Sequence, residues 1–160
     1  MYNAIYNPKT QSTDAPGTWR TLTDAEWTYI IDTRITTSGT RYAKAIVNGV
    51  PGLIVVPDNW DTSTYALNNT NNSGTNYNIN TITSAQWTTL ENTGCVFLPA
   101  AGYRLGTGVR NVGAHGNYWT ATHYSSVYAY IMHFVTNRVY PINHTYRYYG
   151  QSVRLVKDVR

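Results

Sequence analysis

A polar helix start followed by an apolar face forms the first regular pattern of the sequence. Thr23 is placed to cap a helix, and Glu26, three residues later, completes a capping box in which each side chain satisfies the other's backbone donor. Leu22 before the cap and Trp27 at the fourth helical position form a hydrophobic staple. Further apolar residues at helical spacing predict about three turns of helix, ending near Arg34.

The same construction recurs further along the chain. Thr83 and Gln86 form a second predicted capping box, and Ile82 and Trp87 form its staple. Leu90 continues the apolar face at helical spacing. These matching starts predict two helices, and they carry no information on function.

Between the two predicted helices, the apolar runs 42–47 and 53–56 flank a turn at Asn48-Gly49, which is a hairpin signature. Residues 58–80 are rich in Asn, Thr and Ser and form a loop that is long for a compact domain. After the second helix, a short buried strand is predicted at 95–98. Residues 100–116 hold five glycines and are expected to be irregular.

The last third of the chain has a period of two, which predicts strands at 118–122, 128–135, 139–140 and 152–156 and an antiparallel sheet built mainly after Val96. Within 129–135, one face is expected to lie in the core, together with Trp119 and Val153. That face carries Tyr130, Met132 and Phe134. The opposite face is expected to point outward. It carries Ile131, His133 and Val135.

A chain of 160 residues is long enough for one domain with a core. We expect that domain at 19–160, after a lead-in segment at 1–18 that contains a short strand near 4–6. Charged residues are only 12%, and the net charge of +4 comes from scattered arginines, so a nucleic-acid partner is not expected. The polar, Tyr-rich composition favours an extracellular or phage-particle protein. Cys95 is the single cysteine, which excludes an internal disulfide and predicts a buried thiol.

The start of the sequence has no basic segment followed by an apolar one, so no signal peptide is expected at residues 1–4. No apolar run approaches membrane-spanning length, and membrane insertion is not expected. A cytoplasmic protein, part of a phage particle, and a fragment without its leader and neighbouring domains all remain open.

Residues 117–149 have an unusual composition, with eight Tyr, three His and no Lys, Asp, Glu, Gln or Gly. Antibody paratopes have a similar composition, because Tyr supplies rigid amphipathic contact area and Asn and Ser supply adaptable hydrogen bonds. Tyr is also a good strand residue, so a Tyr-rich sheet packed into a core is the alternative. Exposure of this stretch is the favoured interpretation.

Catalytic and metal chemistry has little support in the sequence. The four histidines (His115, His123, His133 and His144) have no metal-ligand spacing, and Ser125 and Ser126 near His123 have no nucleophile-elbow context. Asp58 and Asp61 alone would bind calcium weakly, and the glycine-rich segment lacks the lysine of a phosphate-binding loop. We therefore expect neither an enzyme nor a cofactor, and no metal site.

Several motifs in order resemble a family of gut Bacteroides surface and phage proteins. They are WRTLTDAEW (19–27), AIVNGVPGLIVVPDNW (45–60), VFLPAAGYR (96–104), GNYWTAT (116–122) and RYYGQSVRLV (147–156). The family includes the variable proteins of diversity-generating retroelements, to which the phage major tropism determinant is related. The resemblance implies an α+β, C-type-lectin-like fold, with two helices packed on a small, mainly antiparallel sheet and long irregular loops. The formylglycine-generating enzymes share that fold but work through paired cysteines, and this chain has one.

In the diversified members, adenines of Asn codons are mutated, and the products exclude Lys, Glu, Gln, Met and Trp. By this resemblance, a variable ligand-binding surface is expected within 117–148, while Arg147, Gly150 and Arg154 belong to a fixed frame. The expected variable positions are Asn117, His123, Tyr124, Val127, Tyr128, Ile131, His133, Val135, Arg138, Tyr140, Ile142, Asn143, His144, Tyr146 and Tyr148.

The expected function is adhesion or phage tropism. It would act through recognition of a cell-surface protein or glycan receptor, from the cell surface or a phage particle. Homo-oligomerisation through regions outside this chain is compatible with the resemblance. The alternative is an undiversified surface or fimbrial structural domain whose Tyr-rich face packs on a partner subunit.

Overall fold

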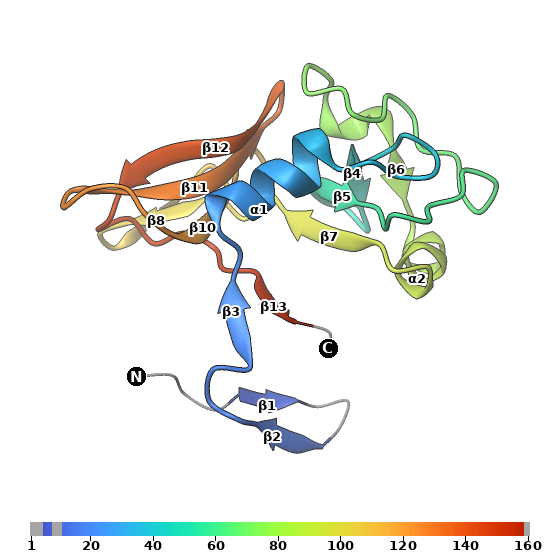
Figure 1. Ribbon diagram of the computed structural model, residues 1–160. Coiled ribbons are helices and arrows are strands. Elements are labelled where there is room, and N and C mark those ends of the chain that lie inside the picture. Colours follow the sequence, from blue (N-terminus) through green and yellow to red (C-terminus); the bar gives the residue numbers. More distant parts are fainter. Residues whose placement is uncertain (1–4, 8–10, 159–160) are drawn as a thin grey trace.

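The computed structural model describes residues 5–7 and 11–158, and the chain is mostly β, with 41% strand and 15% helix (Figure 1). The strands are β1 (Ile5–Asn7), β2 (Ser12–Asp14), β3 (Trp19–Thr21), β4 (Tyr42–Val47), β5 (Val50–Val55), β6 (Thr81–Ile82), β7 (Val96–Pro99), β8 (Tyr103–Leu105), β9 (Gly108–Arg110), β10 (Gly116–His123), β11 (Tyr128–Val135), β12 (Arg138–Tyr146) and β13 (Leu155–Lys157). The helices are α1 (Asp24–Thr28), the π-helix η1 (Tyr29–Thr33), the 3₁₀-helix η2 (Tyr77–Ile79) and α2 (Ser84–Asn92).

The expected α+β, C-type-lectin-like arrangement of helices on one small sheet is wrong. The two α-helices are short, and the strands of the described residues are divided among several small sheets. Much of the strand content beyond that predicted lies in segments for which the sequence predicted no strand. Residues 100–116 form the hairpin β8–β9, β2 lies in the lead-in segment, and β12 runs far beyond the predicted 139–140.

The two helix starts are confirmed. The hydroxyl of Thr23 accepts from the backbone N–H of Glu26, and the carboxylate of Glu26 accepts from the backbone N–H of Thr23, at 3.2 and 2.8 Å. Thr83 and Gln86 make the same pair of contacts. The first helix continues as η1 to Thr33, which confirms the predicted end near Arg34.

A four-stranded sheet in the order β6-β4-β5-β7 divides the interior into two cores. The predicted hairpin is confirmed, with Asn48 (φ 47°) and Gly49 (φ 82°) in the left-handed region that a tight hairpin turn requires. This sheet is built mainly from residues before Val96, whereas the predicted antiparallel sheet after Val96 corresponds to β10-β11-β12. Both faces of β4 and β5 are buried, which explains their continuous apolar runs.

The two cores follow the alternation of β4 and β5. One face packs toward α1 and the three-stranded sheet, and this core contains Leu22, Trp27, Ile31, Tyr42, Leu53, Val55, Tyr77, Leu98, Ala100, Tyr118, Met132 and Phe134. The other face packs toward α2, and this core contains Ala45, Val47, Ile54, Val56, Trp60, Ile82, Leu90 and Cys95. The prediction of a buried thiol at Cys95 is confirmed.

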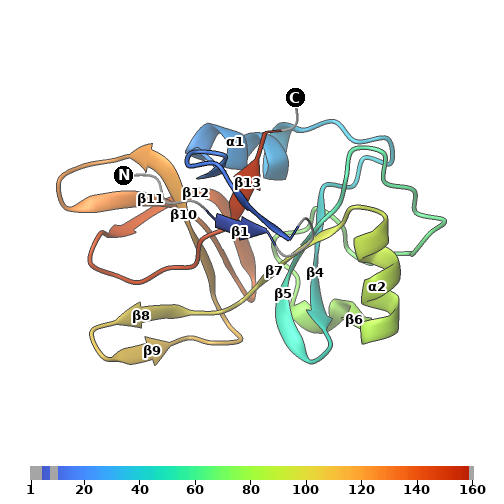
Figure 2. The ribbon, with the colours of Figure 1, turned by 90° about the horizontal axis from the view of Figure 1, so that it is seen from below.

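The second main sheet has the antiparallel order β10-β11-β12 and lies on the opposite side of α1 from β4 and β5 (Figure 1). Strand β11 has the predicted bounds. The pairing register shifts twice, once in β10 between Trp119 and His123 and once in β12 opposite Ile131 to His133. Figure 2 shows the β8–β9 hairpin extending beside this sheet.

Burial on β11 follows the predicted alternation only in part. Met132 and Phe134 are buried as expected, while Tyr130 and Trp119 are half-buried. The expectation that Ile131 faces solvent is wrong, since its exposed fraction is 3%. Ile131 lines a pocket together with Tyr103 of β8 and Gln151 after β12. Val153 is 52% exposed and also contradicts the prediction, because it precedes the edge strand β13 and packs in neither core.

Terminal segments form two small ribbons, β1–β2 and β3–β13. The strand expected near 4–6 corresponds to β1. Ala4 and the rest of segment 1–4, on which the expectation of no signal peptide rests, lie outside the described residues. Neither α-helix of the described part of the chain has the length and apolar character of a membrane span.

A buried lysine holds the two main sheets and the long Asn-rich loop together. Lys44 on β4 is fully buried, and its ammonium donates to the carbonyl oxygens of Ser73 and Thr75 at 2.7 and 3.0 Å. It also donates to the carbonyls of Val135 and Thr136, in the turn between β11 and β12, at 2.9 and 3.0 Å. Burial lowers the pKa of Lys44 to about 8, which leaves the side chain mainly charged at pH 7.

We expect Lys44→Met to destabilise the protein by about 3 kcal/mol, because the four carbonyls lose a charged donor that no neighbouring group replaces. Urea unfolding at pH 7 measures this loss. Lys157→Met is the matched control, since Lys157 pairs with Asp14 at a partly exposed site and such pairs contribute about 1 kcal/mol or less. Equal stabilities of the two variants would contradict the role given to Lys44.

Candidate functional site

Most of the predicted recognition residues with rings belong to one continuous series of ring contacts, which we call the aromatic network. Its members come from β8, the segment before β10, the β10–β11 connection, β11, β12 and the segment after β12. They are Tyr103, His115, Tyr124, Tyr128, Tyr130, His133, Tyr140, His144, Tyr146, Tyr148 and Tyr149.

One half of the network lies on the face of β11 that carries Ile131, His133 and Val135, which we call the odd-numbered face. The ring of His133 stacks on Tyr140 (centroids 5.6 Å apart) and meets His115 edge-to-face at 5.5 Å. Tyr103 continues the series from His115 and stacks on Tyr149 with only 7° between the ring planes. This half therefore depends on the β8–β9 hairpin as well as on the sheet.

Backbone pairing fixes that hairpin in place. The N–H of Arg104 donates to the carbonyl of Gly150 at 2.7 Å, and the N–H of Gly150 donates to the carbonyl of Arg104 at 2.9 Å. Tyr103 and Tyr149 are the neighbours of these two residues, so the bridge positions the stacked pair.

The other half lies on the even-numbered face of β11, beyond the buried Met132 and Phe134. Tyr128 pairs across the strands with Tyr146, and their ring centroids are 4.8 Å apart. Tyr124 packs against Tyr130 at 4.7 Å and stacks on His144 at 4.9 Å. Tyr148 and Tyr149 connect the two halves around the edge strand β12.

The predicted site residues differ in exposure. Eight are exposed, namely His123, Tyr124, Val127, Arg138, Ile142, His144, Tyr146 and Tyr148. Five are half-buried, namely Tyr128, His133, Val135, Tyr140 and Asn143. Two are buried, namely Asn117 and Ile131. These last two can contribute to a surface only as the floor of a pocket.

A β-bulge in β12 decides which of its side chains share a face. Tyr140 lies opposite His133 and Asn143 lies opposite Ile131, so Pro141 and Ile142 together oppose one residue of β11. Tyr140 and Asn143, three positions apart, are thereby on the same face. Simple alternation along β12 would place them on opposite faces, which is why the period of two alone does not predict this arrangement.

A chain of hydrogen bonds fixes the proton on His133. The side-chain amide nitrogen of Asn117 donates to the carbonyl oxygen of Gly102 at 3.2 Å, so the amide oxygen of Asn117 faces His133. That oxygen can only accept, and it lies 2.6 Å from Nδ1 of His133, which is therefore the donor. Nε2 is left as a hydrogen-bond acceptor, and no described residue donates to it.

The electrostatic surroundings keep His133 neutral. Burial and, to a smaller extent, the nearby His115 lower the pKa of His133 to about 4, while the backbone carbonyl of Gly116 opposes the shift. Burial also lowers the pKa of His115. At neutral pH both rings are uncharged, and they act in recognition as aromatic surfaces and hydrogen-bonding groups.

A polar pocket of about 230 Å³ opens on the odd-numbered face, and we call it the His133 pocket. It is lined by Tyr103, His115, Asn117, Ile131, His133, Asn143, His144, Thr145, Tyr149 and Gln151. The side-chain oxygen of Gln151 is buried there and has no hydrogen-bond partner. The structure therefore brings together predicted residues from β10, β11 and β12 with five that the predicted set does not contain.

The missed residues are Tyr103, His115, Thr145, Tyr149 and Gln151. The first two lie in 100–116, which the glycine content suggested was irregular. A usable signal was present at Gly106, which has φ 59° at the first central position of the two-residue β8–β9 turn, as a type II′ turn requires. Nothing local predicts that Tyr149 and Gln151 fold back onto this hairpin.

The segment of the sequence that carries the aromatic network is positively charged. Residues 92–157 contain no Asp or Glu and six Lys or Arg. In the described part of the chain, the four arginines nearest the network in sequence (Arg104, Arg110, Arg138 and Arg147) make no ion pair. The guanidinium of Arg138 lies over the ring of Tyr140 at 5.4 Å.

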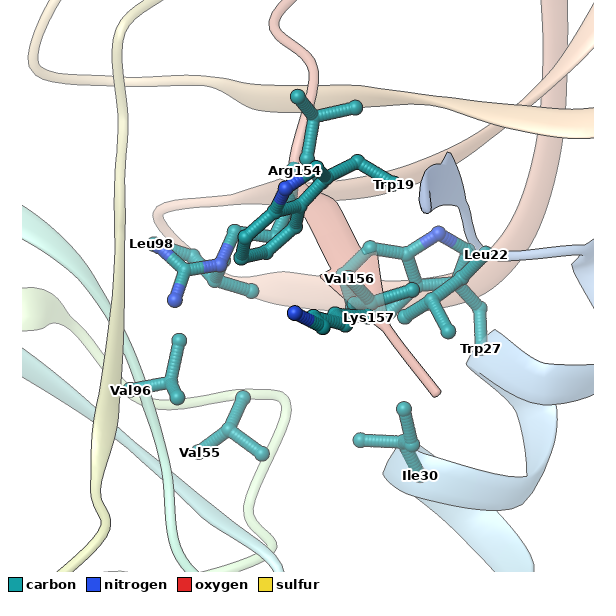
Figure 3. A pocket seen from close by; sticks show the side chains of 11 residues that line it. Trp19, Leu22, Trp27, Ile30, Val55, Val96, Leu98, Arg154, Val156 and Lys157 are labelled. Carbon is teal, nitrogen blue, oxygen red and sulfur yellow. The ribbon is translucent and has the colours of Figure 1, made fainter. Parts of the chain in front are cut away.

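A larger, apolar pocket of about 380 Å³ lies elsewhere, between α1, β5, β7 and the β3–β13 ribbon (Figure 3). Its walls include Leu22, Trp27 and Leu98, which belong to the core, and Arg154 and Lys157 point into it from the chain's end. It contains no residue of the predicted variable set, and it is separate from the aromatic network. Arg154, expected in the fixed frame, lines this pocket.

The residues considered for metal binding have other partners. Asp58 pairs with Arg34 at 3.1 Å, and the carboxylate of Asp61 accepts from the backbone N–H of Ser63 at 2.8 Å. Across residues 5–7 and 11–158, no group of three or more His, Cys, Asp or Glu side chains is placed to hold a metal ion. The contact between His115 and His133 was not predicted from their spacing.

The titration of His133 predicts a dependence of stability on pH. In the unfolded chain a histidine has a pKa of about 6.5, above the folded value of about 4. Unfolded molecules therefore bind the proton first, and stability is lost as pH falls from about 6.5 to about 4, by roughly 2–3 kcal/mol at most.

Urea unfolding at pH 7, 5.5 and 4 tests this expectation. His133→Phe keeps the stacking on Tyr140 and cannot titrate, so its stability should fall less over the same range. All other titrating groups are common to both proteins, so the difference between the two curves isolates His133. Parallel curves would show that His133 has an ordinary pKa in the fold.

Comparison with known proteins places the site within a family. Residues 59–156 match the family DUF8237, described as a domain of unknown function, and the whole aromatic network lies in the matched range. No curated protein matches the sequence, and no solved structure matches the fold. Because the match covers more than half of the chain, the protein belongs to the DUF8237 family.

Proposed function

We propose that this DUF8237 protein is a non-catalytic recognition domain that binds a cell-surface receptor through the aromatic network, in adhesion or in phage tropism. The observation that carries the proposal is the continuity of the network. Rings from six separate segments are in contact around the free edge of β12, and several of them are open to solvent. A soluble domain rarely exposes such a continuous set of large rings unless it binds something.

The chemistry of the network suits non-covalent binding. Tyr and His rings bury a large area at low entropic cost, and their polar ends can still form hydrogen bonds. Tyr124, Tyr146 and Tyr148 are the natural anchors, because they are exposed at 43%, 37% and 67% and each contacts another ring. In protein interfaces, a few such anchors supply most of the binding energy.

The resemblance to the variable proteins of diversity-generating retroelements supports a further part of the proposal. The exposed members of the predicted set are residue types that mutation of Asn codons can produce, and none of them belongs to either core. In this proposal the protein acts at a cell surface or on a phage particle. A second genomic copy of the 117–154 coding region, differing only at adenines, would support diversification, and its absence would count against it.

We expect the triple variant Tyr124→Ser, Tyr146→Ser, Tyr148→Ser to fold like the wild type and to lose binding. Each exposed substitution should change stability by only about 0.5 kcal/mol, whereas loss of one anchor weakens binding by about 2 kcal/mol or more. The measurements are a thermal melt and a binding assay on a panel of bacterial cells.

The control is Tyr29→Ser, which removes a tyrosine that is 54% exposed on η1, away from the network. It should leave both stability and cell binding unchanged. If the triple variant unfolds, or if its binding equals that of the control, the network is a structural interface for a partner subunit. That outcome would favour the undiversified structural domain.

A further inference from the structure

The apolar pocket between α1, β5, β7 and the β3–β13 ribbon has no part in the proposed function, and we call it the Arg154 pocket (Figure 3). Several of its lining residues belong to the core that packs toward α1 or pack against that core. This part of the core therefore borders a cavity instead of other side chains. The apolar lining consists of Trp19, Leu22, Trp27, Ile30, Val55, Val96, Leu98, Leu155 and Val156.

Water in the Arg154 pocket has few groups to bond to. A stably held water makes about two to four hydrogen bonds. The indole N–H of Trp19 already donates to Asp14 at 2.7 Å, and the indole N–H of Trp27 is buried. Replacing poorly held water by hydrocarbon gains free energy. The volume of about 380 Å³ lies within the range of about 300–1,000 Å³ that is usual for small-molecule sites, so the pocket suits a hydrocarbon body.

The charged side chains of the lining are both cations, and both point into the pocket (Figure 3). The ammonium of Lys157 lies 3.3 Å from the carboxylate of Asp14, which offsets its charge. Arg154 is exposed and makes no ion pair or side-chain hydrogen bond with any described residue. Its guanidinium is therefore available to an anionic group, and a carboxylate matches its planar set of donors.

We infer that the Arg154 pocket binds a small monocarboxylate with a hydrocarbon body, such as a medium-chain fatty acid. The hydrocarbon packs on the apolar lining, and the carboxylate accepts from Arg154 at the mouth of the pocket. The inference is independent of the proposed function, because no member of the aromatic network lines this pocket.

The test is isothermal titration calorimetry of the full chain at pH 7 with octanoate, octanol and octylamine, which share one tail and differ in charge. Octanoate should bind about fivefold more tightly than octanol, the upper range for an exposed ion pair. Octylamine should bind more weakly than octanol, because the lining cations repel it. The preference for octanoate should shrink at high salt.

Two variants locate the site. Arg154→Gln should bring octanoate to the affinity of octanol and leave octanol unchanged. Ile30→Trp fills the pocket from η1 and should abolish binding of both, and Val96→Phe fills it from β7 as a second variant. Arg110→Gln is the matched control, because it removes an exposed arginine that does not line the pocket and should change nothing. Thermal melts establish that each variant is folded.

Equal affinities for octanoate and octanol would overturn the inference, as would equal effects of Arg154→Gln and Arg110→Gln. Unchanged octanoate binding in a folded filling variant would place the ligand elsewhere and also overturn it. The proposed function is tested separately by the Tyr124, Tyr146 and Tyr148 triple variant, which should bind octanoate like the wild type. Either claim can therefore fail while the other stands.

Discussion

The ammonium group of Lys44 is the contact on which the arrangement of the two main sheets depends. A charge removed from water is tolerated only when it is fully hydrogen-bonded, and here the partners are backbone carbonyls from two distant segments. Ser73 and Thr75 belong to the long Asn-rich loop, and Val135 and Thr136 belong to the β11–β12 turn. One side chain from β4 therefore holds that loop ordered and fixes one end of the β10-β11-β12 sheet against the core.

The anchoring at one end gives the three-stranded sheet two different halves. Near the Lys44 turn, Met132 and Phe134 pack into the core and the sheet is part of the scaffold. Further along the same face, Tyr128 and Tyr130 contact other rings of the network and belong to neither core. Stability is concentrated in the first half, so side chains of the second half can change without loss of core contacts.

Local patterns in the sequence were sufficient to predict the helices, the first hairpin and β11. The reason is that capping boxes, the Asn48-Gly49 turn and strict alternation each act over a few residues. The fold class was wrong because sheet partnership is not a local property. Nothing near β3 indicates its pairing with β13, and a bulge in β12 changes which side chains share a face with His133. Most of the aromatic residues of the site were predicted, but Tyr103, His115 and Gln151 join them only through tertiary contacts.

The tertiary contacts also divide the predicted variable positions into buried and exposed residues. Asn117 bonds to both Gly102 and His133, so replacing it would leave buried groups without partners. Ile131 is buried and lines the His133 pocket. By contrast, Tyr124, Val127, Tyr146 and Tyr148 are exposed and contribute to neither core. A surface that varies on this scaffold would do so at the open edge of β12, while the His133 pocket, built from mutually bonded residues, would keep one chemistry.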